Sequence, residues 1–189
     1  MLRVKFPLRH ADRLPARRAA PAEPVVEHSL RPRLTAIALS VSEVVRSAGG
    51  WLFDQGLAGW DVSVLTTDHG DARPLRIIGA SGHDLDIVLA SPVDLGMCLH
   101  AIAAPAELYD SDKRVRRMVH NALQAGSAEL RLWGDERPAN LHPGVVPVRY
   151  RLSVAARAFK VHALSATGVV AEAVGDVEVF GIVGTRPLL

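Results

Sequence analysis

The chain has 189 residues, of which 49% are apolar, and it carries a formal net charge of +2 and one cysteine, Cys98. This length favours one good-sized domain, the apolar share excludes general disorder, and a lone cysteine excludes a disulfide framework or a cysteine-rich zinc site. No apolar run approaches the ~20 residues that cross a bilayer, and no signal-peptide core follows the N-terminus. We therefore expect a cytoplasmic protein without membrane contact.

The basic charge is concentrated in residues 1–33, which hold eight Lys and Arg against three Asp and Glu, a net charge of +5. Residues 34–189 hold 14 against 17, a net charge of −3. The first segment also has five prolines and no sustained hydrophobic period, which favours an extended or disordered arm. The expected organisation is an arm over 1–33, an α/β domain over 34–185 and a tail over 186–189.

The domain is predicted to open with a strand and a helix. Residues 34–40 are apolar, and Ser40 followed by Glu43 has the pattern of a capping box, so a helix should run over about 41–57. The glycine pair 49–50 in its middle costs roughly 1 kcal/mol per glycine relative to alanine. This pair indicates a kink or a close packing contact.

Three strand candidates follow over 60–66, 74–80 and 84–90, and the last two are close enough to form a hairpin. The pattern SPVD at 91–94 favours a helix start, with a helix that passes through Ile102 and stops before Pro105.

The rest of the chain alternates between helix and strand patterns. A helix is predicted over 111–125, a strand over 128–134 and a helix over 150–166, whereas 169–183 fits either a hairpin or a helix followed by a strand. Repeated helix–glycine–strand joints favour one α/β domain, a mixed sheet of five or six strands packed with helices.

Signatures of a cofactor are missing. The first strand–helix junction, ALSVSEV, has no glycine, which argues against a dinucleotide site, and no P-loop pattern occurs. Asp68–His69 and His83–Asp84 are the one pair of dipeptides that could converge on a metal, but nothing else supplies the third and fourth ligands of a zinc site. We therefore expect no cofactor and no metal.

Basic residues supply the main candidate interaction surface. The sequence KRVRR at 113–117 places its basic residues on the opposite helix face from Val115 and Val119. With the arm, it gives a candidate contact surface for an anion or nucleic acid. The residues are Arg3, Lys5, Arg9, Arg13, Arg17, Arg18, Lys113, Arg114, Arg116 and Arg117. The leading hypothesis is a non-enzymatic regulatory or adaptor protein that contacts an acidic partner, either nucleic acid or protein.

Two alternatives stay open. One is a small-ligand-binding or enzymatic α/β domain with its site at the carboxyl ends of strands, lined by Asp68, His69, Ser81 and His83. The other is a structural protein that self-associates, as a homo-oligomer, through its tryptophans. These are Trp51, Trp60 and Trp133.

One stretch supports a resemblance. AGGWLFDQGLAGWDVSVLT followed by RPLRIIGA, within residues 47–80, resembles an uncharacterised actinobacterial protein family. The resemblance implies a cytoplasmic bacterial protein, and it carries over no reaction, ligand or functional residue.

Overall fold

The computed structural model describes residues 31–68, 70–91, 99–125, 128–134, 145–168 and 174–183. Within them, seven strands form one sheet in the order β3-β2-β1-β4-β5-β7-β6. The strands are β1 (Arg33–Ala38), β2 (Asp61–Thr66), β3 (Ser81–Asp84), β4 (Ala101–Pro105), β5 (Glu129–Trp133), β6 (Val146–Arg151) and β7 (Val177–Val183). The helices are α1 (Val41–Leu57), α2 (Arg73–Ile77), α3 (Leu85–Ala90), α4 (Ala106–Ser111), α5 (Lys113–Gln124) and α6 (Val154–Ala166).

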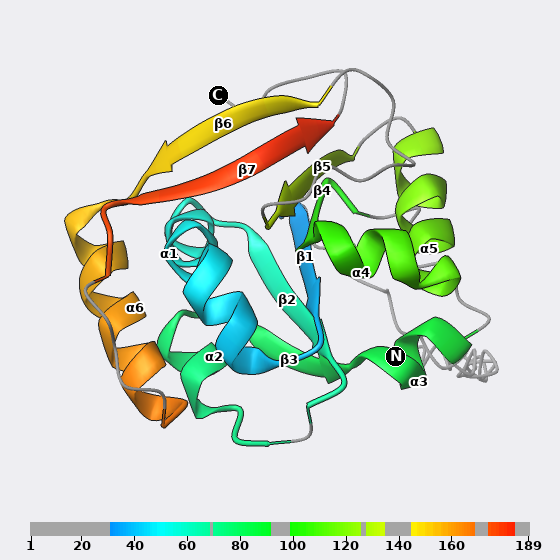
Figure 1. Cartoon of the computed structure of the whole chain (residues 1–189). Coiled ribbons are helices and arrows are strands. Elements are labelled where there is room, and N and C mark those ends of the chain that lie inside the picture. The colour runs from blue at the N-terminus through cyan, green and yellow to red at the C-terminus, as the bar shows by residue number, and fades with distance from the viewer. Residues whose placement is uncertain are drawn as a thin grey trace, which may run out of the picture.

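The sheet is mixed and mostly parallel. Strands β1 to β5 run parallel, β7 pairs antiparallel with β5, and β6 pairs antiparallel with β7. Helices α1, α2 and α6 pack on one face, and α3, α4 and α5 pack on the other, so the core has two halves (Figure 1). The predicted class, one α/β domain with a mixed sheet, is confirmed, and the sheet has more strands than the expected five or six.

The first strand and helix form as predicted. Ser40 Oγ accepts a hydrogen bond from the Glu43 backbone N–H at 3.2 Å and so fixes the start of α1. The glycine pair is a packing contact, since a Cβ atom built on Gly50 would lie 2.5 Å from Leu152 Cδ2. Because Leu152 lies next to Ser153, the N-cap residue of α6, the missing side chain at Gly50 lets α1 and the start of α6 approach closely.

The predicted strands at 74–80 and 84–90 are wrong. These stretches form α2 and α3, and the hairpin between them does not exist. Pro74 sits in the first turn of α2, and the Asp84 carboxylate accepts from the Ile87 backbone N–H at 2.8 Å and caps α3. The stretch expected to be a connection, Ser81–Asp84, is the short edge strand β3, which runs parallel to β2.

The helix predicted to reach Ile102 is wrong at its end. Ile102 lies in β4, all five residues of which are buried between β1 and β5. A strand covered on both faces shows a continuous apolar run, which periodicity does not distinguish from a helix. The beginning of the predicted helix, residues 92–98, lies outside the described residues.

The C-terminal segments complete the sheet. The predicted helices at 111–125 and 150–166 correspond to α5 and α6, and the predicted strand at 128–134 corresponds to β5. Strand β6 was not predicted: its residues are mostly exposed, and the alternation of Val146, Val148 and Tyr150 with Pro147 and arginines was not recognised as a strand. In the segment 169–183, for which two predictions stayed open, a final strand is observed as β7. Its antiparallel partners are β5 and β6.

Residues 1–30 of the expected arm and the expected tail over 186–189 lie outside the described residues, whereas Arg33, the last residue of the expected arm, is the first residue of β1. In the described part of the chain, no helix is long and apolar enough to cross a membrane.

Candidate functional site

The carboxyl ends of the parallel strands are the first place to look for a site. In open α/β sheets, ligands bind where the strand order reverses, outside the carboxyl ends. Here the chain proceeds from β1 to β2 and β3 in one direction, and from β4 to β5 in the other. The switch point therefore lies between β1 and β4, and the first turn of α1 begins beside it.

A carboxylate is held at this switch point. Glu43 lies in the first turn of α1, where the helix dipole favours negative charge. Its Oε2 accepts from the Leu39 backbone N–H at 3.4 Å, and its Oε1 accepts from the Trp133 indole Nε1–H at 3.3 Å. Because Trp133 ends β5, its indole reaches past the end of β4 to contact α1. Two donors therefore orient one partly buried carboxylate.

Hydroxyl groups surround this carboxylate along the chain. Ser40 Oγ and Ser42 Oγ lie 3.2 Å apart, and Thr67 Oγ1 donates to the Leu39 carbonyl at 3.0 Å. The last contact ties the end of β2 to the end of β1. The edge thus combines a carboxylate with hydroxyl donors and acceptors, a set that can bind a polar ligand and move a proton.

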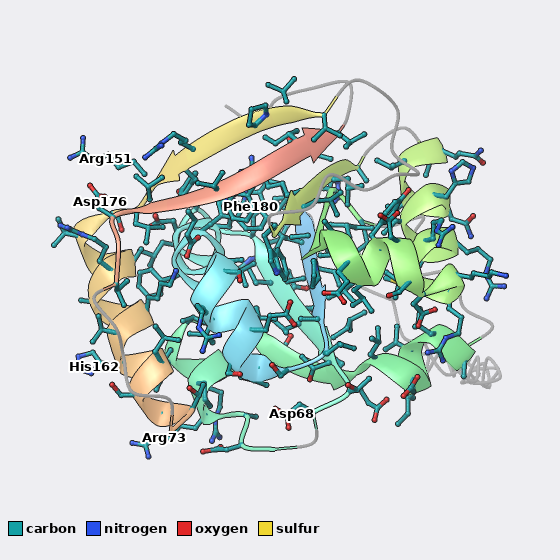
Figure 2. The ribbon with its side chains drawn as sticks, in the orientation of Figure 1. Asp68, Arg73, Arg151, His162, Asp176 and Phe180 are labelled. Atoms are coloured by element: carbon teal, nitrogen blue, oxygen red, sulfur yellow. The ribbon has the colours of Figure 1, made fainter. Side chains whose placement is uncertain are left out.

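Asp68 lies apart from this group. Its Oδ1 accepts from the Gly70 backbone N–H at 2.9 Å, the geometry of an Asx turn, and its side chain is exposed. Figure 2 shows Asp68 on the loop between β2 and α2, at the periphery of the molecule. Asp68 is thus a turn former here.

The other predicted pocket residues lie on the edge strand. Ser81 Oγ and His83 Nε2 are 3.3 Å apart, and Ser81 also contacts Ser63 Oγ at 3.3 Å. The structure therefore brings Ser81 and His83 together on β3, and among the described residues no hydrogen bond joins either of them to Asp68. His69 lies outside the described residues.

The described residues at the carboxyl edge do not form a ligand set for a divalent metal. Glu43, Asp68 and Asp84 are described carboxylates near the carboxyl ends of β1, β2 and β3, and each accepts a hydrogen bond from a backbone N–H group. Over the described ranges, no three His, Cys, Asp or Glu side chains gather as a metal site would require.

The basic face of α5 is partly occupied by contacts within the protein. Arg114 pairs with Asp86 and with Asp112, each at 2.9 Å, and these carboxylates raise the pKa of the guanidinium, Asp112 most strongly. Lys113 and Arg117 are exposed.

Arg116 has a structural role. It donates from Nε to the Tyr109 carbonyl at 3.3 Å and from Nη2 to the Asp110 carbonyl, so it binds the C-terminal part of α4. The predicted contact residues of the arm, Arg3 to Arg18, lie outside the described residues.

The tryptophans are largely core residues. Trp51 is fully buried against Phe180, at 5.2 Å between ring centroids, and Trp133 is also buried. Trp60 is partly buried and packs edge-on against His100. The first two therefore serve packing within the domain.

Sequence reasoning missed a group of buried charges beneath α1. These are Glu129, Arg131, Lys160 and Glu178. Arg131 donates to Glu129 at 2.7 Å and lies over the Trp51 ring, 4.7 Å from its centroid. The signal was the alternation in ELRLW, which places the charged residues of β5 on the same sheet face as Trp133.

Known structures share this architecture. The chain is similar to the A40926 pseudoaglycone deacetylase Dbv21, with a TM-score of 0.50, 17% identity, and coverage of 71% of this chain and 81% of that chain. It is similar to a deacetylase in a complex with teicoplanin, with a TM-score of 0.51, 13% identity, and coverage of 81% and 98%. A deacetylase–bog complex from the teicoplanin pathway gives a TM-score of 0.50, 15% identity, and coverage of 70% and 82%.

These likenesses establish that the chain shares its fold with these solved deacetylases, at low sequence identity. No protein-family model and no curated protein matches the sequence. The likeness to these structures is therefore one of fold, and it covers most of the chain. The resemblance noted in the sequence concerned residues 47–80 alone. The neighbours are enzymes, which contradicts the expectation of a non-enzymatic regulatory or adaptor protein and favours the alternative of a site at the strand carboxyl ends.

Proposed function

We propose that this chain is an enzymatic α/β domain that binds a small acetylated molecule at the carboxyl edge of its sheet and hydrolyses the acetyl group. The observation that carries the proposal is the Glu43 carboxylate, oriented by Leu39 and Trp133 at the point where strand order reverses. The deacetylase fold of the solved neighbours supports the reaction class.

The chemistry assigned to the site is general-base hydrolysis. Glu43 accepts a proton from a water molecule as the water oxygen attacks the acetyl carbonyl carbon. The bond from that carbon to the leaving nitrogen or oxygen then breaks, and the proton passes to the leaving group while acetate departs. Ser40 and Ser42 supply hydroxyls that bind polar substrate groups beside the carboxylate.

The test is acetate release from a panel of N-acetylated and O-acetylated sugars and amines by the purified full chain. Glu43→Gln keeps the shape and removes the base, so kcat should fall by about 10²–10⁴-fold. Trp133→Phe removes the indole donor and should lower kcat more than it changes KM. Asp176→Asn, on an exposed residue at the remote corner of α6 and β7, is the matched control (Figure 2).

Two results would overturn the proposal. One is the absence of acetate release and of any thermal shift across the whole panel. The other is activity that Glu43→Gln leaves at the level of Asp176→Asn, because the carboxylate would then take no part in the reaction.

A further inference from the structure

A cavity lies on the face of the sheet that α3 and α5 cover, and it extends along the sheet from the first residues of β1 and β2 to Leu65 and His83. It has a volume of about 280 Å³. Its lining residues are Arg33, Thr35, Asp61, Ser63, Leu65, His83, Val88, Leu99 and Met118. Leu65 belongs to the core half under α3 and α5, whereas Glu43 lies on α1 beside Trp133 in the other half, so the cavity is distinct from the site that holds Glu43.

The sheet provides a polar wall. Side chains alternate between the faces of a strand, so Arg33 and Thr35 share one face of β1, and Asp61 and Ser63 share the same face of β2. The register pairs Arg33 with Asp61 and Thr35 with Ser63 across the two parallel strands. The guanidinium of Arg33 and the carboxylate of Asp61 are therefore on neighbouring strands in the same register. The hydroxyls of Thr35 and Ser63 form the next pair on this face, two residues further along the strands.

The edge strand extends this wall. His83 lines the cavity, and its Nε2 lies 3.3 Å from Ser81 Oγ, which in turn lies 3.3 Å from Ser63 Oγ. Ser63 is thus connected to the imidazole through a chain of hydrogen-bonding groups. The hydroxyl groups in this series can rotate, so they can donate a hydrogen bond to a bound polar group or accept one from it.

The charged pair is available to a ligand. Among the ion pairs between described residues, none engages Arg33 or Asp61. Arg33 carries a guanidinium group and Asp61 a carboxylate group. A ligand that carries both a carboxylate and an ammonium group would satisfy the two side chains together.

The helices provide an apolar wall. Val88 of α3, Met118 of α5 and Leu99, just before β4, line the cavity opposite the strands. The small volume lies at the lower end of the range for small-molecule sites, which is about 300–1,000 Å³. A ligand of this size would have a polar end at the sheet and a short apolar part at the helices.

We propose that this cavity binds a free α-amino acid with an apolar side chain. Arg33 binds the carboxylate, Asp61 binds the ammonium group, and the aliphatic part lies against Val88, Leu99 and Met118. The proposal goes beyond the proposed hydrolytic function and does not depend on it, because it uses other residues on the opposite face of the sheet.

Calorimetric titration of the full chain with L-leucine tests the proposal. We expect saturable binding, and at least about tenfold weaker binding of 4-methylpentanoate, which lacks the ammonium group, and of 3-methylbutylamine, which lacks the carboxylate; tenfold corresponds to about 1.4 kcal/mol. Glycine should also bind more weakly, because it has no apolar part.

Variants assign the binding to this cavity. Asp61→Asn should remove the preference for leucine over 4-methylpentanoate, and Arg33→Gln should remove the preference for leucine over 3-methylbutylamine. Val88→Phe should block binding by filling the cavity, with circular dichroism confirming the fold. Arg151→Gln and Asp176→Asn, on exposed residues at the distant corner shown in Figure 2, are the matched controls and should bind leucine like the wild-type chain.

The proposal is overturned if leucine at about 10 mM does not bind the wild-type chain. This concentration would detect binding with a free energy of only about −3 kcal/mol. It is also overturned if leucine binds but Asp61→Asn, Arg33→Gln and Val88→Phe all bind it as the controls do. In that case the ligand would occupy another part of the molecule.

Discussion

Lys160 and Glu178 form a buried ion pair beneath the middle of α1. Lys160 Nζ lies 2.6 Å from Glu178 Oε1, and the side chains are only 7% and 2% exposed. The same carboxylate accepts from the backbone N–H groups of Gly50 at 2.9 Å and Trp51 at 2.8 Å. One carboxylate thus connects α6, β7 and the glycine-containing centre of α1.

Removing the cation should destabilise the fold strongly. Lys160→Met leaves the Glu178 carboxylate buried without its counter-ion, a change that costs about 3–5 kcal/mol for such pairs. The free energy of unfolding from urea titration measures the loss. The double variant Lys160→Met/Glu178→Gln should recover part of it, since no buried charge is left. A loss below about 1 kcal/mol in the single variant would contradict the structural importance of the pair.

The same carboxylate predicts a pH dependence. Burial raises the pKa of Glu178 above its usual value, and Lys160 and the two backbone N–H groups only partly oppose this effect. A raised pKa in the folded state means that the folded chain binds the proton more readily than the unfolded chain. The stability contributed by protonation is therefore present below the unfolded value of 4.5 and is lost as pH rises through the folded pKa.

Comparison with Glu178→Gln isolates this term. The difference in unfolding free energy, wild type minus variant, should become more favourable to the wild type as pH falls from neutral toward 4.5. Urea titrations at a series of pH values measure the trend. A difference that is constant across this range would show that the pKa of Glu178 is not raised.

Two glycines of α1 should respond oppositely to alanine. At Gly50 a Cβ atom would lie 2.5 Å from Leu152 Cδ2, and Leu152 is buried, so Gly50→Ala should cost about 1–3 kcal/mol through overpacking. At Gly56 nothing lies within 4 Å of a Cβ atom, so Gly56→Ala should stabilise by about 0.4–1 kcal/mol. Thermal and urea unfolding of both variants check this; stabilisation by both would mean that Leu152 moves aside freely.

Tyr150 should ionise late. Its hydroxyl donates to Asp54 Oδ2 at 3.2 Å, and burial, with the negative charge of Asp54 as the next cause, raises the pKa of Tyr150 to about 12. The stability linked to the protonated phenol is complete below pH 10, the unfolded value, and is lost as pH rises through about 12.

Ultraviolet titration of the phenolate follows this ionisation. Burial also raises the pKa of Tyr109, so neither of the two tyrosines should be half ionised at pH 10 while the chain is folded. Asp54→Asn should lower the midpoint of Tyr150, and Tyr109→Phe assigns the signal. A normal midpoint near 10 in the Tyr109→Phe variant would contradict the buried hydrogen bond.

Local signals in the sequence determined several elements without tertiary information. Ser40 and Glu43 mark the start of α1 because a side-chain cap acts within one turn. The alternation of β2 and the apolar stripe of α5, with Val115, Val119 and Ala122 buried, likewise follow from periods of two and 3.6 residues. These features sufficed for the α/β class and for the tight contact at Gly50.

Only the tertiary structure decided the rest, because it depends on partners far away in the chain. At β4, burial on both faces erases the period that distinguishes a strand from a helix, so the strand was predicted as a helix. At α2 the error was the reverse, a short helix predicted as a strand. Glu43 meets Trp133 across 90 residues, and Arg33 stands beside Asp61 through the register of β1 with β2. No local pattern encodes strand order or register, so both candidate sites became visible only when the sheet was assembled.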